Sequence, residues 1–268
     1  WNGLMIGALA DAAAAFGRSD WLTAAQAAFA FVRDHMQRDG RLFHTWRRGE
    51  AKHTGLLDDY AAMASAALTL FEHTGERGYR DQAITWVEVL DRHFWDAGDG
   101  GYFITADDVA DVIVRGKHAQ DSSQPAGNGI MVHVLARLHY LTGDVRYREQ
   151  AETLISAFAG EVESNFVPLA TFLNGIERLQ MGLQIVVIGT RETSDTQALL
   201  DVVHGIALPD RILQVVDSPA NLPEAHPAAN KAAASGGTAT AYVCRGPQCS
   251  LPITDPDVLR AELAGSST

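Results

Sequence analysis

The sequence predicts a mainly helical fold of αα-hairpins, followed by a small C-terminal α/β unit. Three observations carry this prediction: a motif that occurs three times between helical patterns, long connections between its copies, and strand-like apolar runs from about Met181 onward. The 268 residues allow one large domain or two small ones. We expect a helical domain over residues 1–180 and an α/β unit over residues 181–268.

The repeated motif is a glycine, an aromatic residue four positions later and an alanine four positions after that. Its copies are centred on Gly17, Gly75 and Gly143, and apolar residues at helical spacing lie on both sides of each glycine. A glycine at this place is typical of a helix that ends in the left-handed conformation. Each copy therefore predicts two helices joined by a short turn.

The connections between the hairpins are far longer than the usual 2 to 8 residues or so of helix–helix loops. This length argues against a simple helical bundle or an α-solenoid. Residues 41–46 and 51–54 predict one β-hairpin, and residues 101–105 and 112–115 predict a second one around a polar turn at 107–111. Because each connection joins the end of one hairpin to the start of the next, all of them collect at one end of the array, where we expect the functional site.

The segment after Met181 changes to a pattern of alternating strands and helices. It predicts a buried strand over 184–189, a helix over 195–204, a second strand over 211–216, a mobile loop over 217–237, a third strand over 240–244 and a final helix that starts at Asp255–Pro256. The first three of these elements form a βαβ unit. The glycine after Ile188 lacks the G-x-G-x-x-G pattern, so this unit carries no nucleotide fingerprint.

Composition excludes several classes of partner. The formal net charge is -12, which argues against nucleic acid or an anionic membrane surface as the main partner. No uninterrupted apolar run of about 20 residues is present, so we expect no bilayer-spanning helix. The chain begins at Trp1 inside a helical pattern, without a methionine or a signal peptide, and this predicts that it is the later part of a longer protein.

The two cysteines predict no disulfide framework and favour a reducing, cytoplasmic location. Cys244 and Cys249 are spaced too widely for a C-x-x-C redox pair, and zinc would need two further ligands where only the distant His226 is available. We therefore expect free or loosely paired thiols, no metal site and no cofactor.

The predicted site end collects polar and aromatic side chains from helix starts and connections. We expect Asp58, Asp59 and Asp121 as catalytic acids, bases or hydroxyl anchors, and as substrate-binding residues Trp1, Asn2, His44, Trp46, His53, Tyr60, Arg115, Lys117 and Asn128. Aromatic faces stack on sugar rings, and carboxylates hold hydroxyl groups or transfer protons. This combination predicts a cleft for a sugar or a sugar-like metabolite.

Structural interpretations of the same residues stay open. An Asp–Asp pair at a helix start is typical of a cap, and His44 and His53 are placed for a cross-strand structural pair. Trp46 also suits a cover over its hairpin, and Lys117 with Asp121 an ordinary ion pair. Two acids would suit glycoside hydrolysis, whereas a histidine pair would suit epimerisation, and spacing alone does not choose between these reactions.

Five strings together carry a resemblance to a known family: WNGLMIGALADA, GLLDDYAAMASAALTLFEHTG, GGYFIT, RGKHAQDSSQPAGNG and AYVCRGPQCSLPITDPDVL. With them the chain resembles the C-terminal part of the thioredoxin-domain-containing proteins of the bacterial YyaL type, whose animal relatives are the spermatogenesis-associated thioredoxin-like proteins. The likeness covers nearly the whole chain apart from residues 217–237. Residues 122–127 depart from the Gly-Ala-x-Pro-Ser that relatives more often carry there.

The resemblance implies an α/α toroid of the six-hairpin glycosidase-like type, similar also to N-acylglucosamine 2-epimerases. It implies that this chain contains only part of the toroid. It implies that a thioredoxin-like domain and earlier hairpins precede this part, and it matches Asp58, Asp59, Lys117, Asp121 and Asn128 to recurring positions of the family. Our leading hypothesis is therefore a protein that binds or processes a sugar. The alternatives are a non-catalytic scaffold that positions a thioredoxin-like domain or a client protein, and an epimerase-like isomerase that uses His44 or His53.

Overall fold

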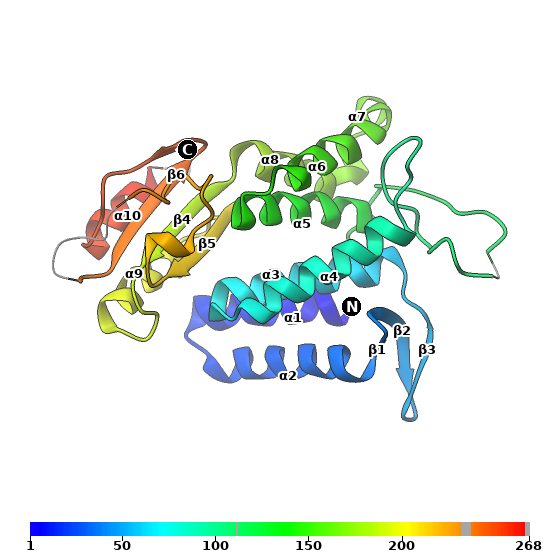
Figure 1. The fold of residues 1–268 in the computed structure, drawn as a ribbon, viewed down its shortest axis with the longest axis horizontal. Helices are drawn as coiled ribbons and strands as arrows, with labels where there is room; N and C mark the ends of the chain where they lie inside the picture. The colour runs from blue at the N-terminus through cyan, green and yellow to red at the C-terminus, as the bar shows by residue number, and fades with distance from the viewer. Residues whose placement is uncertain (111, 232–236, 266–268) are drawn as a thin grey trace.

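The computed structural model describes residues 1–110, 112–231 and 237–265, and it consists of two layers of helices with an α/β unit at one end (Figure 1). The six helices of the predicted hairpins are α1 (Asn2–Phe16), α2 (Ser19–His35), α3 (Leu57–Thr74), α4 (Arg77–His93), α5 (Gly127–Thr142) and α6 (Val145–Ala157). The hairpin prediction is confirmed. Gly17, Gly75 and Gly143 each follow the first helix of a hairpin with φ values of 64°, 76° and 71°, the left-handed conformation expected of them.

The first helices of the hairpins form the inner layer and the second helices form the outer layer. Helix α3 packs between α1 and α5, and the inner layer continues with α8 (Ala170–Met181), which packs against α5. Helices α3 and α5 are buried on nearly all sides, which explains why their sequences are apolar around most of the helix. The sequence analysis missed α8, the short helix α7 (Ala159–Ser164) and the 3₁₀ turn Val167–Leu169 that precedes α8.

One of the two predicted β-hairpins is present. Strands β1 (Gln37–Arg38), β2 (Arg41–Arg47) and β3 (Glu50–Thr54) form an antiparallel sheet in that order. The second predicted hairpin is wrong where it can be judged, since residues 101–105 contain only an isolated bridge between Trp95 and Tyr102, and residue 111 lies outside the described residues. The Asn128 side chain bonds both the N–H and the carbonyl of Tyr102, so the backbone that a partner strand would need is already satisfied.

The C-terminal unit contains the predicted βαβ arrangement. Its elements are β4 (Leu183–Ile188), α9 (Ser194–His204), β5 (Arg211–Val216), the 3₁₀ turn Pro219–Asn221, β6 (Thr240–Arg245), β7 (Gln248–Cys249) and α10 (Pro256–Ala264). The sheet order is β5-β4-β6-β7, with β4 and β5 parallel and the other pairs antiparallel. Apolar clusters cover both faces of β4, which explains why its sequence is apolar except for Gln184.

The prediction of free thiols is wrong, because Cys244 and Cys249 form a disulfide. The two-residue strand β7 pairs antiparallel with β6, and the register places the two cysteines opposite each other. The final helix starts as predicted, with Asp255 accepting the backbone N–H of Asp257 at 2.7 Å. Of the predicted loop 217–237, residues 232–236 lie outside the described part of the chain.

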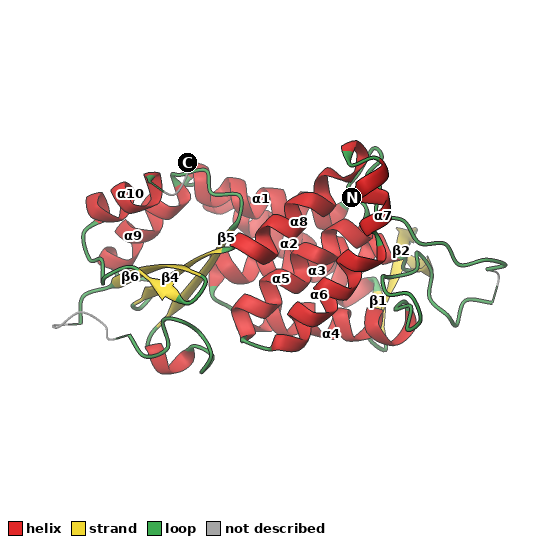
Figure 2. Ribbon diagram, turned by 90° about the horizontal axis from the view of Figure 1, so that it is seen from above, coloured by secondary structure: helices red, strands yellow, loops and turns green. Residues whose placement is uncertain are grey.

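The long connections and the N-terminus lie at one end of the helices, and the α/β unit lies at the other (Figures 1 and 2). Helix α8 ends at Met181 and β4 begins at Leu183, so the chain passes from the helical layers to the α/β unit between these residues. The division into two domains stays a prediction. Within the residues that the structure describes, every helix is too short or too polar to cross a membrane.

Candidate functional site

Two adjoining cavities lie at the end of the helices where the connections gather. Their volumes are about 260 and 290 Å³, and Trp1, His44 and Asp59 belong to the lining of both. Asn2 lines only the smaller cavity, and Asp58 and Gln124 line only the larger one. We call these two spaces together the linker-end cavity. Several of the predicted site residues therefore meet at one place.

His44 and Asp59 form a hydrogen-bonded pair in the linker-end cavity. The Nδ1 atom of His44 lies 2.8 Å from Oδ2 of Asp59, and the same oxygen accepts the backbone N–H of Leu56 at 2.8 Å. Asp59 thus caps α3 and orients the imidazole from strand β2 at once. A carboxylate on Nδ1 favours the tautomer that leaves Nε2 as an acceptor. Nε2 has no hydrogen-bond partner among the described residues, and the His44 side chain is 46% exposed.

Asp58 lies where the N-termini of α3 and α5 meet. Its Oδ1 accepts the backbone N–H of Gly127 at 2.8 Å, and its Oδ2 accepts from the Gln124 amide at 3.3 Å. Burial raises the pKa of the Asp58 carboxyl, although the Gly127 hydrogen bond opposes this effect. Asp58 therefore takes up a proton at a higher pH than an exposed aspartate does.

Asp121 is fully engaged by backbone groups. Its Oδ1 accepts the N–H of Ala126 at 2.9 Å, and its Oδ2 accepts the N–H of Thr171 at 2.8 Å. The carboxylate thereby ties the start of α5 to the start of α8. Asp121 is not among the residues that line the linker-end cavity.

Arg115 and Lys117 hold the long connection between α4 and α5 together. Lys117 forms an ion pair with Asp96 at 2.6 Å, so the alternative interpretation that pairs it with Asp121 is wrong. This ion pair lowers the pKa of the Asp96 carboxyl. The Arg115 guanidinium donates to two backbone carbonyls and lies 4.1 Å from the centre of the Phe103 ring.

The remaining predicted residues lie in the core or on the outside of the hairpin. Tyr60 and Asn128 are fully buried, and the Tyr60 hydroxyl accepts the backbone N–H of Leu42 at 2.8 Å. Trp46 packs against the rings of Phe31 and His35, as a cover over the hairpin would. The register of β2 and β3 pairs Phe43 with Thr54 and Thr45 with Lys52, which puts His53 near His44 but with a left-handed φ of 60°. The lining of the linker-end cavity, as far as the structure describes it, does not include His53.

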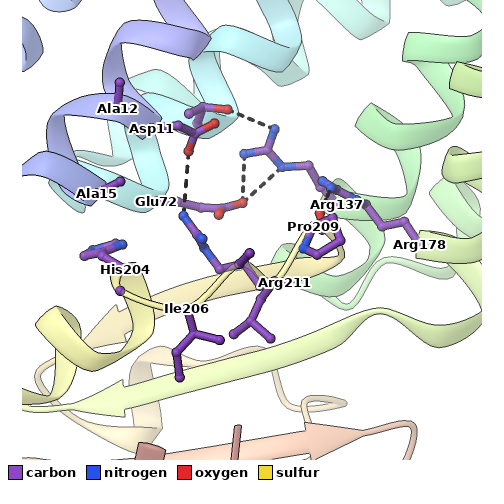
Figure 3. Close-up of a pocket in the computed structure, with 14 residues that line it drawn as sticks. Asp11, Ala12, Ala15, Glu72, Arg137, Arg178, His204, Ile206, Pro209 and Arg211 are labelled. Carbon is purple, nitrogen blue, oxygen red and sulfur yellow. Dashed lines mark hydrogen bonds and ion pairs between the residues drawn. The ribbon is translucent and has the colours of Figure 1, made fainter. Parts of the chain in front are cut away.

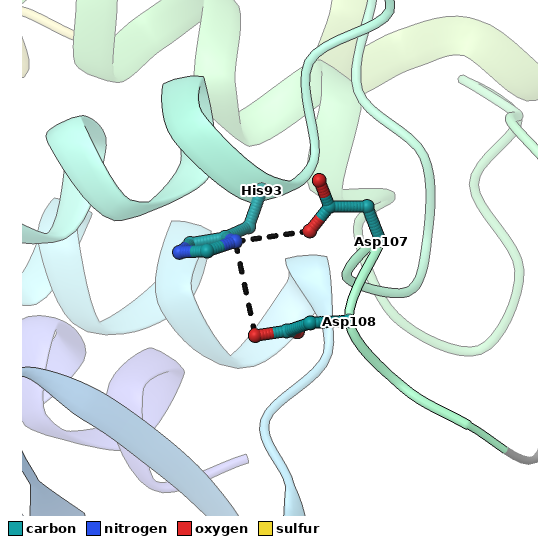
Figure 4. A group of neighbouring side chains, drawn as sticks. All are labelled: His93, Asp107 and Asp108. Atoms are coloured by element: carbon teal, nitrogen blue, oxygen red, sulfur yellow. Dashed lines mark hydrogen bonds and ion pairs between the residues drawn. The ribbon is translucent and has the colours of Figure 1, made fainter.

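A second group of ionisable side chains contains His93, Asp107 and Asp108 (Figure 4). His93 Nδ1 lies 2.9 Å from Asp107 and 3.8 Å from Asp108. Arg41 already contacts both carboxylate oxygens of Asp108, at 2.7 and 2.9 Å, and lowers the pKa of this carboxyl. Asp108 is therefore already paired with a guanidinium, and His93 lies beside both carboxylates.

The sequence analysis missed a larger cavity at the opposite end of the helices (Figure 3). Its volume is about 640 Å³, and it lies between the inner helices and the segment that joins α9 to β5. We call it the interdomain cavity. Its walls carry a buried ion pair in which Arg137 donates to Glu72 at 2.8 and 3.0 Å. The sequence signal for this pair is that Glu72 and Arg137 each interrupt an otherwise apolar helical stripe.

The helical part of the chain matches a known protein family. The sequence profile of the N-acylglucosamine 2-epimerase family matches residues 8–167, which contain both halves of the His44–Asp59 pair. The chain belongs to the N-acylglucosamine 2-epimerase family. In this family member, three complete hairpins and helix α8 make up the helical layers.

Curated relatives of this epimerase-family chain extend the match to its C-terminal unit. The human and rat proteins called spermatogenesis-associated protein 20 are each 32% identical over 274 residues, covering 97% of this chain and 35% of their own length. An uncharacterised protein of Caenorhabditis elegans is 27% identical over 276 residues. The chain thus spans about a third of the length of these relatives. The resemblance to spermatogenesis-associated proteins is confirmed, whereas a preceding thioredoxin-like domain stays a prediction.

Solved structures share the fold of this epimerase-family chain at low identity. Cellobiose 2-epimerase from Spirochaeta thermophila superposes with a TM-score of 0.50 and 18% identity, over 61% of this chain and 43% of that one. A GH76 alpha-mannanase from Bacteroides thetaiotaomicron superposes with a TM-score of 0.53 and 17% identity, over 76% and 55% of the two chains. The predicted fold, a partial six-hairpin α/α toroid with a small α/β unit, is confirmed.

Proposed function

We propose that this chain binds a reducing sugar in the linker-end cavity and that His44 exchanges a proton with the carbon next to the sugar carbonyl. The carrying observation is the His44–Asp59 hydrogen bond, which orients an imidazole at the cavity and leaves Nε2 without a partner among the described residues. Membership of the N-acylglucosamine 2-epimerase family supports this substrate class and this type of reaction.

The arrangement supplies the parts that such a proton exchange needs. Asp59 accepts the Nδ1 proton, so the lone pair on Nε2 acts as the base that removes the proton beside the carbonyl. The His44 imidazolium formed in this step then returns a proton to the same carbon. Return to the opposite face, after the intermediate has turned over in the cavity, inverts the configuration of that carbon. Because burial raises the pKa of Asp58, this carboxyl suits a hydrogen bond to a sugar oxygen. The exposed face of Trp1, a side chain in both parts of the cavity, suits stacking on the ring.

Hydrolysis of a glycosidic bond fits the geometry less well. A hydrolase needs two carboxyl groups on opposite sides of the bond to be cleaved. Asp58 and Asp59 follow each other on α3, and both oxygens of Asp121 accept backbone N–H groups. We therefore favour proton exchange over hydrolysis and assign Asp121 to positioning the starts of α5 and α8.

A second candidate function is a non-catalytic scaffold that positions a thioredoxin-like domain or a client protein. One observation favours it: Asp58, Asp59 and Asp121 each accept at least one backbone N–H, as purely structural caps do. The relatives also extend well beyond the part that this chain matches. This alternative predicts that sugars do not bind.

Binding distinguishes the two candidates. We would titrate the chain with N-acetylglucosamine, N-acetylmannosamine, mannose and cellobiose by isothermal titration calorimetry. The proposal predicts saturable binding of at least one sugar, weakened about tenfold by His44→Ala, since a hydrogen bond of about 1.4 kcal/mol accounts for that factor. His53→Asn is the matched control from the facing strand and is expected to bind as the unchanged chain does. Absence of saturable binding with all four sugars would favour the scaffold.

A further inference from the structure

The interdomain cavity (Figure 3) has no lining residue in common with the linker-end cavity. Asp11 of α1, Glu72 of α3, Arg137 of α5 and Arg178 of α8 come from the C-terminal halves of these helices. His204 and the residues that follow it, up to Arg211, close the space from the α/β unit. A volume of about 640 Å³ lies within the range of roughly 300 to 1,000 Å³ typical of small-molecule sites.

The lining of this cavity is rich in arginine. Three arginines line it against the two carboxylates of Asp11 and Glu72. Arg137 is satisfied within the protein, because it bonds Glu72, the Ser65 carbonyl and the Thr69 hydroxyl. Burial lowers the pKa of His204 to about 3, so this ring is neutral at physiological pH and adds no charge. The other two arginines have only looser carboxylate partners, with Arg178 3.8 Å from Asp210 and Arg211 3.7 Å from Asp11.

The guanidinium groups of Arg178 and Arg211 keep unused donors. The Nε atom of each is buried and has no hydrogen-bond partner in the part of the chain that the structure describes. Their nearest carboxylates lie beyond hydrogen-bond distance, with Arg178 Nε 3.8 Å from Asp210 and Arg211 Nη2 3.7 Å from Asp11. A buried N–H without a partner costs free energy. Arg178 Nη2 donates to the Pro209 carbonyl, and the other Nη groups of the two guanidiniums have no hydrogen-bond partner among the described residues, so they can donate to an oxyanion.

Two further features describe the ligand that would fit. Burial, together with the neighbouring charge of Arg137, lowers the pKa of Arg178 to about 10, so its guanidinium remains protonated at neutral pH. Ala12, Ala15 and Ile206 supply an apolar wall to the same cavity. An anionic group with an apolar body matches both walls.

We propose that the interdomain cavity binds a small organic anion, a phosphate ester or a carboxylate, whose oxyanion accepts hydrogen bonds from Arg178 and Arg211. The planar fork of a guanidinium matches the oxygen spacing of both groups. The body of the ligand lies against Ala12, Ala15 and Ile206. Because the ligand would bridge α8 and β5, its binding links the helical layers to the α/β unit. This site stands independently of the sugar site.

Phenyl phosphate and benzoate test the two forms of the anion, and phenol is the uncharged analogue. Calorimetric titration of the chain is expected to show saturable binding of at least one anion and none of phenol. Which anion binds identifies the phosphate or the carboxylate form. Arg178→Gln and Arg211→Gln are each expected to weaken binding about tenfold or more, the effect of losing one charge-assisted hydrogen bond. Arg148→Gln, on the exposed face of α6, is the matched control and is expected to leave the affinity unchanged.

Hydrogen exchange on the unsubstituted chain provides a readout that does not depend on a variant folding. Bound anion is expected to slow amide exchange in residues 204–211 and in α8. The proposal is overturned if neither anion binds saturably, if phenol binds as well as the anions, or if folded Arg178→Gln and Arg211→Gln bind with unchanged affinity. It is also overturned if protection appears only away from the interdomain cavity.

Discussion

Glu72 and Arg137 show at the residue scale how the inner helices are held together. Their side chains are 7% and 5% exposed, and the pair joins α3 to α5 in the middle of an apolar layer. A buried pair of this kind is weak evidence for net stability, because desolvation offsets the attraction between the charges. Removal of one partner is a different matter, since it leaves a buried charge uncompensated.

We therefore expect Arg137→Met to lower the free energy of unfolding by about 3 to 5 kcal/mol. Urea denaturation measures this change. Arg148→Met is the matched control, because Arg148 pairs with Glu152 on the exposed face of α6 and such pairs contribute only about 0.3 to 0.5 kcal/mol. Equal losses in the two variants would contradict the assigned role of the buried pair.

His133 gives a prediction about pH at the same scale. Burial lowers its pKa to about 3, against about 6.5 in the unfolded chain. As the pH falls below about 6.5, the unfolded chain binds this proton first, so the contribution of His133 to stability is complete above that pH and is lost toward pH 3. The loss amounts to about 1.4 kcal/mol per pH unit in the middle of this range.

The substitution His133→Gln is expected to remove the part of the acid-induced loss of stability that is due to His133. The glutamine amide can still donate to the Thr171 carbonyl, which lies 3.0 Å from His133 Nε2. Urea unfolding at pH 7.5 and pH 5 gives the difference in unfolding free energy for each protein. The variant should show the smaller difference. An unchanged difference would mean that His133 is not kept neutral by the fold.

At the scale of elements, the helical hairpins were predictable because their signals are local. The glycine-centred motif and the helical periodicity lie within one hairpin, and left-handed glycines occur where the motif placed them. The second β-hairpin failed because Asn128, 26 residues away, satisfies the backbone of Tyr102. The disulfide was missed because a two-residue strand sets the register of Cys244 against Cys249.

Two of the left-handed glycines provide an element-scale prediction. Gly17 and Gly143 have similar φ values, 64° and 71°. The left-handed conformation therefore destabilises an alanine at either position by about 1 to 2 kcal/mol. A Cβ at Gly17 would meet open space, whereas one at Gly143 would lie 2.9 Å from Cβ of Pro223. We expect Gly143→Ala to lose more unfolding free energy than Gly17→Ala. Thermal or urea unfolding compares them directly, and equal losses would contradict the packing of Pro223 against the end of α5.

At the scale of the whole molecule, the two ends of the helices carry different chemistry. The linker end gathers residues that sequence position alone could bring together, because each lies at a helix start or in the connection before it. Even so, the sequence did not show that Asp59 bonds His44 or that both oxygens of Asp121 are taken.

The opposite end is formed where the α/β unit packs against the helices, and no local sequence pattern predicts this contact. Arg191 of the α/β unit donates to the carbonyls of Glu72 and His73 at 2.8 and 2.9 Å, at the last turn of α3. This contact joins segments more than a hundred residues apart, and the interdomain cavity lies at the same junction. The end where the connections gather was therefore predictable from the sequence, whereas the cavity between the helices and the α/β unit was not.

Proton exchange at a sugar carbon tests the central claim most directly. The chain is incubated in D₂O with N-acetylmannosamine, N-acetylglucosamine, mannose and cellobiose in turn, and proton NMR follows the signal of the hydrogen next to the carbonyl carbon. We predict loss of this signal with at least one sugar and a rate at least about 100-fold lower in His44→Gln, the usual scale of a general base. No deuterium uptake with any sugar, or equal uptake in His44→Gln, would contradict the assignment of His44 as the base.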